Sequence, residues 1–131
     1  MMRRNRKGFT LVEIMIVVAI IALLAAIAIP NLMSAKRTAN TAAAKANIRA
    51  LSTAAEVYAT GHNGNYPGDE ASLRPYIAAS QVLCGATQPQ QGYTYTCTLA
   101  AAAYTITAVK ASATTGDIDY SVTNGGVITE S

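Results

Sequence analysis

The sequence predicts an α+β protein in which one long N-terminal helix packs on a small antiparallel β-sheet. Residues 9–29 form an almost unbroken apolar run, and residues 31–60 contain neither glycine nor proline. Residues 93–131 instead alternate tyrosine or β-branched residues with threonine, and turn residues interrupt them. A helical pattern followed by a period of two indicates a helix first and a sheet afterwards.

The apolar run is long enough to cross a bilayer. It holds 21 residues, of which only Thr10 and Glu13 are polar, and a helix of that length measures about 32 Å. Pro30 follows it, and a proline removes one backbone hydrogen bond and kinks or locally opens a helix. We therefore expect residues 9–30 to be a transmembrane segment with a kink at Pro30. Four basic residues precede the run, which favours a cytoplasmic N-terminus: Arg3, Arg4, Arg6 and Lys7.

Glu13 is the one charge inside the apolar run, and a carboxylate in a membrane helix is costly without a positive partner. No lysine, arginine or histidine lies between Phe9 and Ser34, so the helix itself offers no partner. Cleavage between Gly8 and Phe9 would create an α-amino group four residues from Glu13, on the same helical face. That amine could pair with its own Glu13 or with that of a neighbouring molecule. The second arrangement would set an axial register between molecules.

These residues resemble a known signal. A basic leader, the hexapeptide GFTLVE at residues 8–13, about sixteen apolar residues and Pro30 are similar to the class III signal of type IV prepilins and type II secretion pseudopilins. The resemblance implies that residues 1–8 are a leader, that a prepilin peptidase cuts after Gly8, and that it methylates the Phe9 amine. It also implies that Phe9 and Glu13 of adjacent subunits meet in a helical filament.

Two other interpretations of the N-terminus remain open. An ordinary signal peptide could end at the A-x-A pattern of residues 26–28 and release a secreted binding domain by cleavage after Ala28. A plain single-pass anchor would make Glu13 incidental. The apolar run is longer than a usual signal-peptide core, contains a glutamate and is followed by Pro30, which argues against the signal peptide. N-terminal sequencing of the mature protein separates cleavage before Phe9 from cleavage before Ile29.

Residues 31–60 are predicted to continue as an amphipathic helix. Ten of the 25 residues from 35 to 59 are alanine, the strongest helix former. Apolar positions with a 4-3-4-3 spacing should face the globular part: Ala44, Ile48, Leu51, Ala55 and Tyr58. The basic residues lie elsewhere and are expected on a solvated face or at lipid headgroups, with contacts to a neighbouring subunit or DNA left open: Lys36, Arg37, Lys45 and Arg49.

Glycines and prolines end this helix and open a loop region, residues 61–92, with a possible short helix at 72–79 that Pro75 interrupts. Residues 93–131 are predicted to form a meander of three or four antiparallel strands. The strand signals fall at residues 93–99, 104–109, 118–122 and 127–129, with a hairpin turn at 123–126. One face of this sheet should lie on the apolar stripe of the helix.

Cys84 and Cys97 fall in the part expected outside the cytoplasm, where a disulfide is favoured over two reduced thiols. Such a bridge contributes about 3 kcal/mol in the chain-entropy model, which helps a domain of this small size. The formal net charge of +3 does not favour nucleic acid. Without residues 1–8 the chain has six basic and seven acidic side chains, a net charge of −1.

No pattern of residues predicts an enzyme, a metal site or a cofactor. His62 stands alone in a glycine-rich loop, and no catalytic triad, P-loop or dinucleotide motif is present. Asp117 and Asp119 could share a calcium ion, but calcium usually takes six or more oxygen ligands. The resemblance implies an acidic calcium-binding loop in major pseudopilins, and its absence here favours a pilin.

The sequence therefore predicts a structural subunit of a type IV pilus-like filament that serves adhesion, twitching motility or DNA uptake. The alternative within the family is a pseudopilin of a type II secretion or DNA-uptake system. The resemblance implies as partners further copies of the chain, the peptidase, an inner-membrane platform and a motor ATPase. The expected location is the inner membrane, with the C-terminal part outside the cytoplasm, and then an extracellular pilus or periplasmic pseudopilus.

Overall fold

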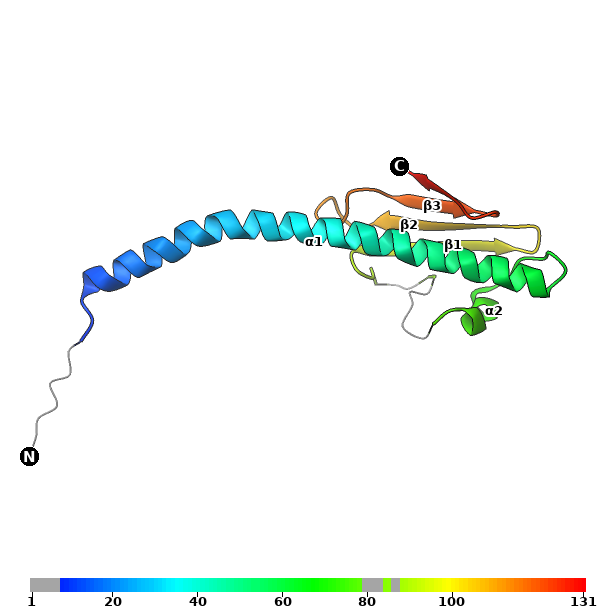
Figure 1. Ribbon diagram of the computed structural model, residues 1–131, viewed down its shortest axis with the longest axis horizontal. Coiled ribbons are helices and arrows are strands. Elements are labelled where there is room, and N and C mark those ends of the chain that lie inside the picture. The colour runs from blue at the N-terminus through cyan, green and yellow to red at the C-terminus, as the bar shows by residue number, and fades with distance from the viewer. Residues whose placement is uncertain (1–7, 79–83, 86–87) are drawn as a thin grey trace, which may run out of the picture. The chain divides into compact units, whose positions relative to one another are not determined.

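The computed structural model describes residues 8–78, 84–85 and 88–131. The long helix α1, Leu11–Gly61, comes first, followed by the short helix α2, Glu70–Leu73, and the 3-10 helix η1, Arg74–Tyr76. Four strands complete the order: β1, Tyr93–Ala100; β2, Ala103–Lys110; β3, Tyr120–Thr123; and β4, Val127–Glu130 (Figure 1). The predicted α+β class is confirmed. The chain divides into two compact units, Met1–Ser34 and Ala35–Ser131.

In the first unit α1 is apolar on every side. Its most apolar 18-residue window has a mean hydropathy of 3.0, and none of that window is buried. By length and composition alone this helix could cross a membrane. Pro30 lies inside α1, and the helix continues on both sides of it. The basic residues expected in the leader lie outside the described residues.

In the second unit α1 buries one stripe only. Six buried residues lie three or four positions apart, as the spacing predicts, and Ser52 and Ala54 lie beside them on the same face. The six are Thr41, Ala44, Ile48, Leu51, Ala55 and Ala59. Tyr58 departs from the predicted stripe, because it is half-buried and Ala59 takes the inward position. The Tyr58 ring instead stacks on His62 at 3.8 Å and meets Tyr76 edge-on at 5.7 Å between ring centroids.

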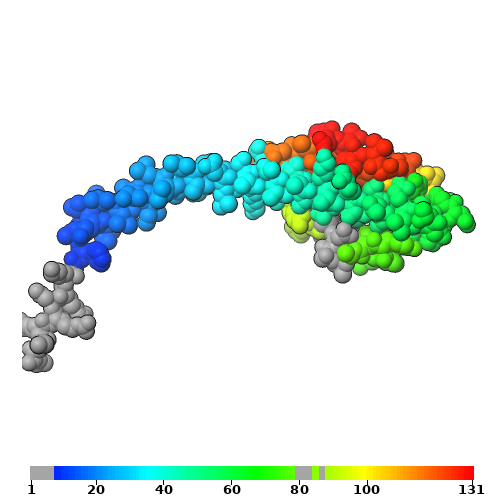
Figure 2. Space-filling model, in the orientation of Figure 1, coloured from blue at the N-terminus to red at the C-terminus, as the bar shows by residue number. Residues whose placement is uncertain are grey.

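The sheet has the order β1-β2-β3-β4, and each neighbouring pair is antiparallel. Its inward side chains are mostly tyrosines and β-branched residues that pack with the stripe of α1 in one core: Tyr93, Tyr95, Tyr104, Ile106, Tyr120 and Val122. The space-filling view shows the strand residues closely packed along the second half of α1 (Figure 2). The meander therefore has all four predicted strands.

The short helix differs from its predicted range of 72–79. It begins at Glu70 because the Asp69 carboxylate caps it, accepting a hydrogen bond from the Ser72 backbone at 2.8 Å. The Ser72 hydroxyl also donates to this carboxylate at 2.8 Å, and the hydroxyl and backbone hydrogen bonds together lower the pKa of Asp69. The helical turns end at Tyr76, where Ile77 takes an extended backbone. Residue 79 of the predicted range lies outside the described residues.

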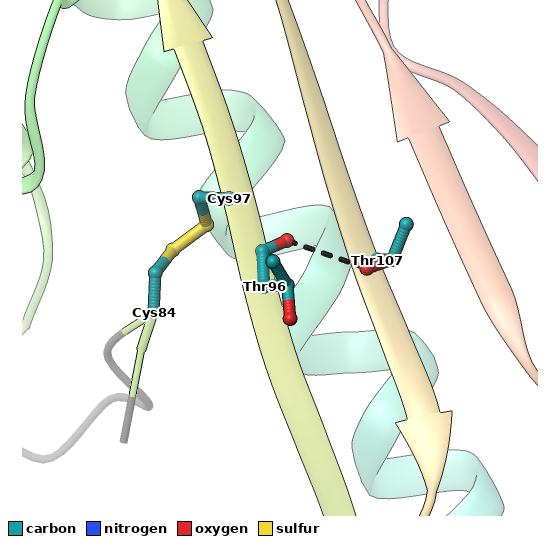
Figure 3. The surroundings of a disulfide bond; sticks show 4 residues. All are labelled: Cys84, Thr96, Cys97 and Thr107. Atoms are coloured by element: carbon teal, nitrogen blue, oxygen red, sulfur yellow. Dashed lines mark hydrogen bonds between the residues drawn. A yellow bond between two sulfur atoms is a disulfide. The ribbon is translucent and has the colours of Figure 1, made fainter. Parts of the chain in front are cut away.

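The predicted disulfide between Cys84 and Cys97 is confirmed, with the two Cα atoms 5.5 Å apart. It ties the loop before the sheet to β1 (Figure 3). A backbone hydrogen bond of 3.0 Å from Gly85 to Tyr95 runs beside it. Figure 3 also shows β2 beside β1 next to the bridge, where the side-chain hydroxyl of Thr107 donates to the Thr96 carbonyl at 3.4 Å. The bridge and the hydrogen bond from Gly85 therefore hold Cys84 and Gly85 beside β1.

Candidate functional site

The N-terminus of α1 is closed by a reciprocal pair of side chains. The Glu13 Oε2 atom accepts hydrogen bonds from the backbone nitrogen of Thr10 at 2.7 Å and from its hydroxyl at 2.8 Å. In return, the Thr10 hydroxyl accepts from the Glu13 backbone nitrogen at 3.2 Å. This is a capping box, in which a threonine before the first helical residue and a glutamate three positions later satisfy each other's backbone groups.

The capping box gives Glu13 a neutral partner that was not predicted, while the three salt bridges of the described residues use other carboxylates. The neutral groups of Thr10 satisfy the carboxylate locally, and the pattern T-x-x-E before an apolar run is the sequence signal that could have predicted it. Both hydrogen bonds that the Glu13 carboxylate accepts fall on its Oε2 atom. Gly8 and Phe9 precede the helix, and the Phe9 side chain is 85% exposed. The bond between them therefore lies in non-helical backbone.

The basic residues of α1 divide into two groups. Arg37 forms an ion pair with Asp117, and Lys45 forms one with Glu130 at 2.6 Å. The hydrogen bond and charge of Glu130 raise the pKa of the Lys45 ammonium. These two cations tie α1 to the loop before β3 and to β4, so the expectation of a solvated face is wrong for them. Lys36 and Arg49 are exposed, as expected.

The two aspartates considered for calcium each have a cationic partner. Asp117 pairs with Arg37, and its backbone nitrogen donates to the Thr41 hydroxyl at 3.0 Å. Asp119 accepts from the backbone nitrogen of Lys110 at 2.8 Å and faces its ammonium at 3.3 Å. Within residues 8–78, 84–85 and 88–131, no three histidine, cysteine, aspartate or glutamate side chains gather as metal ligands would.

A polar network around Glu56 was not predicted from the sequence. Its carboxylate accepts from the Tyr104 hydroxyl at 2.9 Å, from the Gly125 backbone at 2.7 Å and from the Tyr66 hydroxyl at 3.3 Å. Ser52 also hydrogen-bonds the Tyr104 hydroxyl, at 2.8 Å. Burial, together with the charge of Glu56, raises the pKa of Tyr104 to about 12. The carboxylate thus joins α1 to the loop after it, to β2 and to the β3–β4 turn.

Comparison with known proteins places the first 30 residues in a described class. Residues 3–29 match the family model of the prokaryotic N-terminal methylation motif. The chain is 38% identical over 94 residues to the type II secretion system core protein G of Klebsiella michiganensis. These residues are 71% of this chain and 66% of that protein. It is 44% identical over 70 residues to a type IV wide pilus major component of Thermus thermophilus, 53% of each chain.

A third relative matches a shorter segment at higher identity. The type IV major pilin of Myxococcus xanthus is 59% identical over 51 residues, which are 39% of this chain and 23% of that pilin. The aligned segments span about half to two thirds of the length of the first two relatives.

The capped, fully exposed apolar helix and the small disulfide-bonded sheet define a class of long-helix α+β proteins that carry an N-terminal methylation motif. This chain belongs to the family of type IV pilins and type II secretion pseudopilins.

Proposed function

We propose that this chain is a structural subunit of a type IV pilus-like filament. A peptidase removes residues 1–8 by cutting after Gly8 and methylates the Phe9 amine. The processed subunit leaves the membrane and polymerises through the apolar part of α1. The motif at residues 3–29 and the relatives in pili and secretion systems support this proposal.

The observation that carries the proposal is an apolar helical segment that is left exposed among the described residues. Its large side chains are 51–74% exposed from Leu11 to Leu32, and so large an apolar surface is unstable in water. In the precursor, lipid would cover it. In a filament, other copies of the same helix would cover it, and Pro30 would lie within that bundle as a point where the backbone lacks one hydrogen bond.

Glu13 is proposed to act in assembly. The capping box uses Oε2, so Oε1 remains for a further donor. The amine of Phe9 from a neighbouring subunit is the cation that processing would supply. The ion pair would form in apolar surroundings, where only a correct stagger leaves no charge unpaired.

The proposed partners are further copies of the chain, the prepilin peptidase, and an inner-membrane platform with its motor ATPase. The precursor would span the inner membrane once, with the body from Ala35 onward outside the cytoplasm, consistent with the disulfide. The mature subunit would then lie in an extracellular pilus, where adhesion, twitching motility or DNA uptake would be its task.

A pseudopilin of a type II secretion or DNA-uptake system is the second candidate, supported by the match of core protein G over 71% of this chain. Against it, Asp117 and Asp119 are held by Arg37 and Lys110. Their ion pairs fit a loop stabilised by salt bridges better than the calcium-binding loop that the family resemblance implies for major pseudopilins.

Two measurements test the proposal. N-terminal sequencing of the mature protein should begin at Phe9, methylated on its amine, whereas a start at Ile29 would establish an ordinary signal peptide. Electron microscopy of sheared surface fractions should show long filaments that contain this chain. Filaments absent from the surface, together with a loss of protein secretion on deletion of the gene, would establish the pseudopilin instead.

A further inference from the structure

A groove of about 280 Å³ runs between the second half of α1 and the β3–β4 hairpin. Val57 of α1, which is 49% exposed, and Ile128 of β4 supply its apolar wall. Arg49 stands at one end of the helical side, and Glu56 lies two turns further along α1, about 10 Å away. The groove therefore has a positive end, an apolar middle and a negative end.

Arg49 has no ion-pair partner among the described residues, whereas Arg37 and Lys45 on the same helix do. The three salt bridges of the described chain use Arg37, Lys45 and Lys110. An exposed, unpaired guanidinium beside an apolar wall suits a carboxylate ligand, because its planar fork binds two carboxylate oxygens.

A segment on the other side of the body has the opposite order of charges. Figure 1 shows α2 and β4 on opposite sides of the second half of α1. Glu70, in the first turn of α2, is partly buried and has no ion-pair partner among residues 8–78, 84–85 and 88–131. Arg74 follows four residues later, at the start of η1, and Tyr76 is 40% exposed.

The carboxylate of Glu70 is unusual in this chain. Each other carboxylate of the second unit accepts a hydrogen bond or forms an ion pair within the described residues: Glu56, Asp69, Asp117, Asp119 and Glu130. Glu70 is thus the one carboxylate of the second unit without a partner among the described residues. Of the bases there without an ion pair, Lys36, Arg49 and Arg74, only Arg49 lines the groove. This arrangement suits a contact between two copies that uses a different surface of each, the kind of contact that builds a helical polymer.

We propose that the segment from Glu70 to Tyr76 of a second copy docks in this groove, with Glu70 paired to Arg49. In this orientation Arg74 approaches the Glu56 end, and the exposed ring of Tyr76 covers the apolar wall at Val57. The inference rests on the proposed function, since it assigns a second contact, between the C-terminal bodies, to the same filament. Neither surface can pair with itself. Each copy therefore uses its groove for one neighbour and its segment from Glu70 to Tyr76 for another, and the contact repeats along a polymer.

The first test is charge reversal in the full-length chain, expressed in cells that assemble the filament. R49E and E70R should each lower the amount of sheared filament at least tenfold, because each places like charges face to face. The double variant R49E/E70R should restore the amount to within about twofold of the native level. The mismatched double variant K36E/E70R, which reverses an exposed cation outside the groove, should stay as low as E70R.

The second test does not depend on charge. The variant R49C/E70C should form covalent dimers and longer ladders when sheared filaments are mildly oxidised, while R49C, E70C and K36C/E70C should remain monomeric. An R49E/E70R variant that stays defective, together with no ladder from R49C/E70C, would overturn the docking proposal. Native filaments in the same preparations would show that the proposed function survives, whereas their absence from the native strain would remove the proposed function itself.

Discussion

The two halves of α1 differ in what covers them, although they belong to one helix. From Leu11 to Leu32, isoleucine, leucine and valine side chains are 51–74% exposed. Beyond Ala35, Ile48 and Leu51 are 0–1% exposed. The first half is apolar all round, and no single sheet could bury it. The second half is apolar along one stripe, which the sheet of the same chain covers.

This difference separates two kinds of stability. The body from Ala35 onward completes its own core, so substitutions there should change its unfolding. The apolar half gains burial only from lipid or from other molecules, so substitutions there should change insertion and assembly and leave the unfolding of the body unaltered. Each prediction below tests that separation.

The largest effect is expected at Glu13. Glu13→Gln keeps the shape of the side chain but cannot form an ion pair with a neighbour's amine, and an uncompensated amine in apolar surroundings is strongly unfavourable. We expect filament yield to fall on the order of 100-fold, measured by quantifying sheared subunits. The melting temperature of the body should stay unchanged. Normal filament yield from this variant would remove the assembly role of Glu13.

The matched pair Ile48→Ala and Ile21→Ala compares the halves directly. Ile48 is 0% exposed and Ile21 is 59% exposed. Ile48→Ala leaves a cavity and should lower the free energy of unfolding by about 2–5 kcal/mol, while Ile21→Ala should change it by less than about 0.5 kcal/mol. Denaturant unfolding in detergent measures both. Equal effects would mean that the two halves share one folding unit.

Removing the disulfide should act on the body alone. The double variant Cys84→Ser/Cys97→Ser opens a bridge with a sequence separation of 13 residues and should cost about 3 kcal/mol. Thermal unfolding should show a midpoint lower by roughly 12–24 °C for a domain of this size. Reducing agent added to the native protein is the control, and it should reproduce the shift without a substitution.

Gly116 allows the Tyr93 hydroxyl to reach the carbonyl of Ile118, to which it donates at 2.8 Å. A Cβ atom added at Gly116 would lie 2.2 Å from that hydroxyl oxygen. Gly116→Ala should therefore destabilise the body by about 1–3 kcal/mol. Gly68→Ala is the control, because a Cβ atom added at Gly68 would have no other atom within 4 Å. Similar melting temperatures for the two variants would contradict this packing.

The smallest effect is a pH dependence at Tyr104. Burial, with the charge of Glu56, raises the pKa of Tyr104 from 10.0 to about 12 in the folded body. The unfolded chain loses this proton first, so its contribution to stability is complete below pH 10 and is lost as the pH rises towards 12. Unfolding at pH about 9 and about 11 should show a loss that Tyr104→Phe reduces. An identical loss in the variant would assign it to other groups.

Much of this fold was accessible from local patterns. The apolar run, the alanine-rich stripe and the period-two segments predict the helix and all four strands, because each pattern reports which face of an element meets the core. The capping box was accessible too, since Thr10 and Glu13 are three residues apart, although only a charged partner for Glu13 was considered. The short helix was placed too late because the capping role of Asp69 was not recognised.

By itself, the sequence determined that residues 9–29 need a covering that shields them from water, since their composition leaves no polar face. It also determined whether each later element follows a helical or a period-two pattern, because such a pattern is a local feature of the sequence. Only the tertiary structure decided which charges find partners. Glu56 meets Tyr104 and Gly125 across 48 and 69 residues, whereas Arg49 and Glu70 find none among the described residues. Such pairings depend on how the elements pack, and no local pattern encodes the distance between side chains that are remote in sequence.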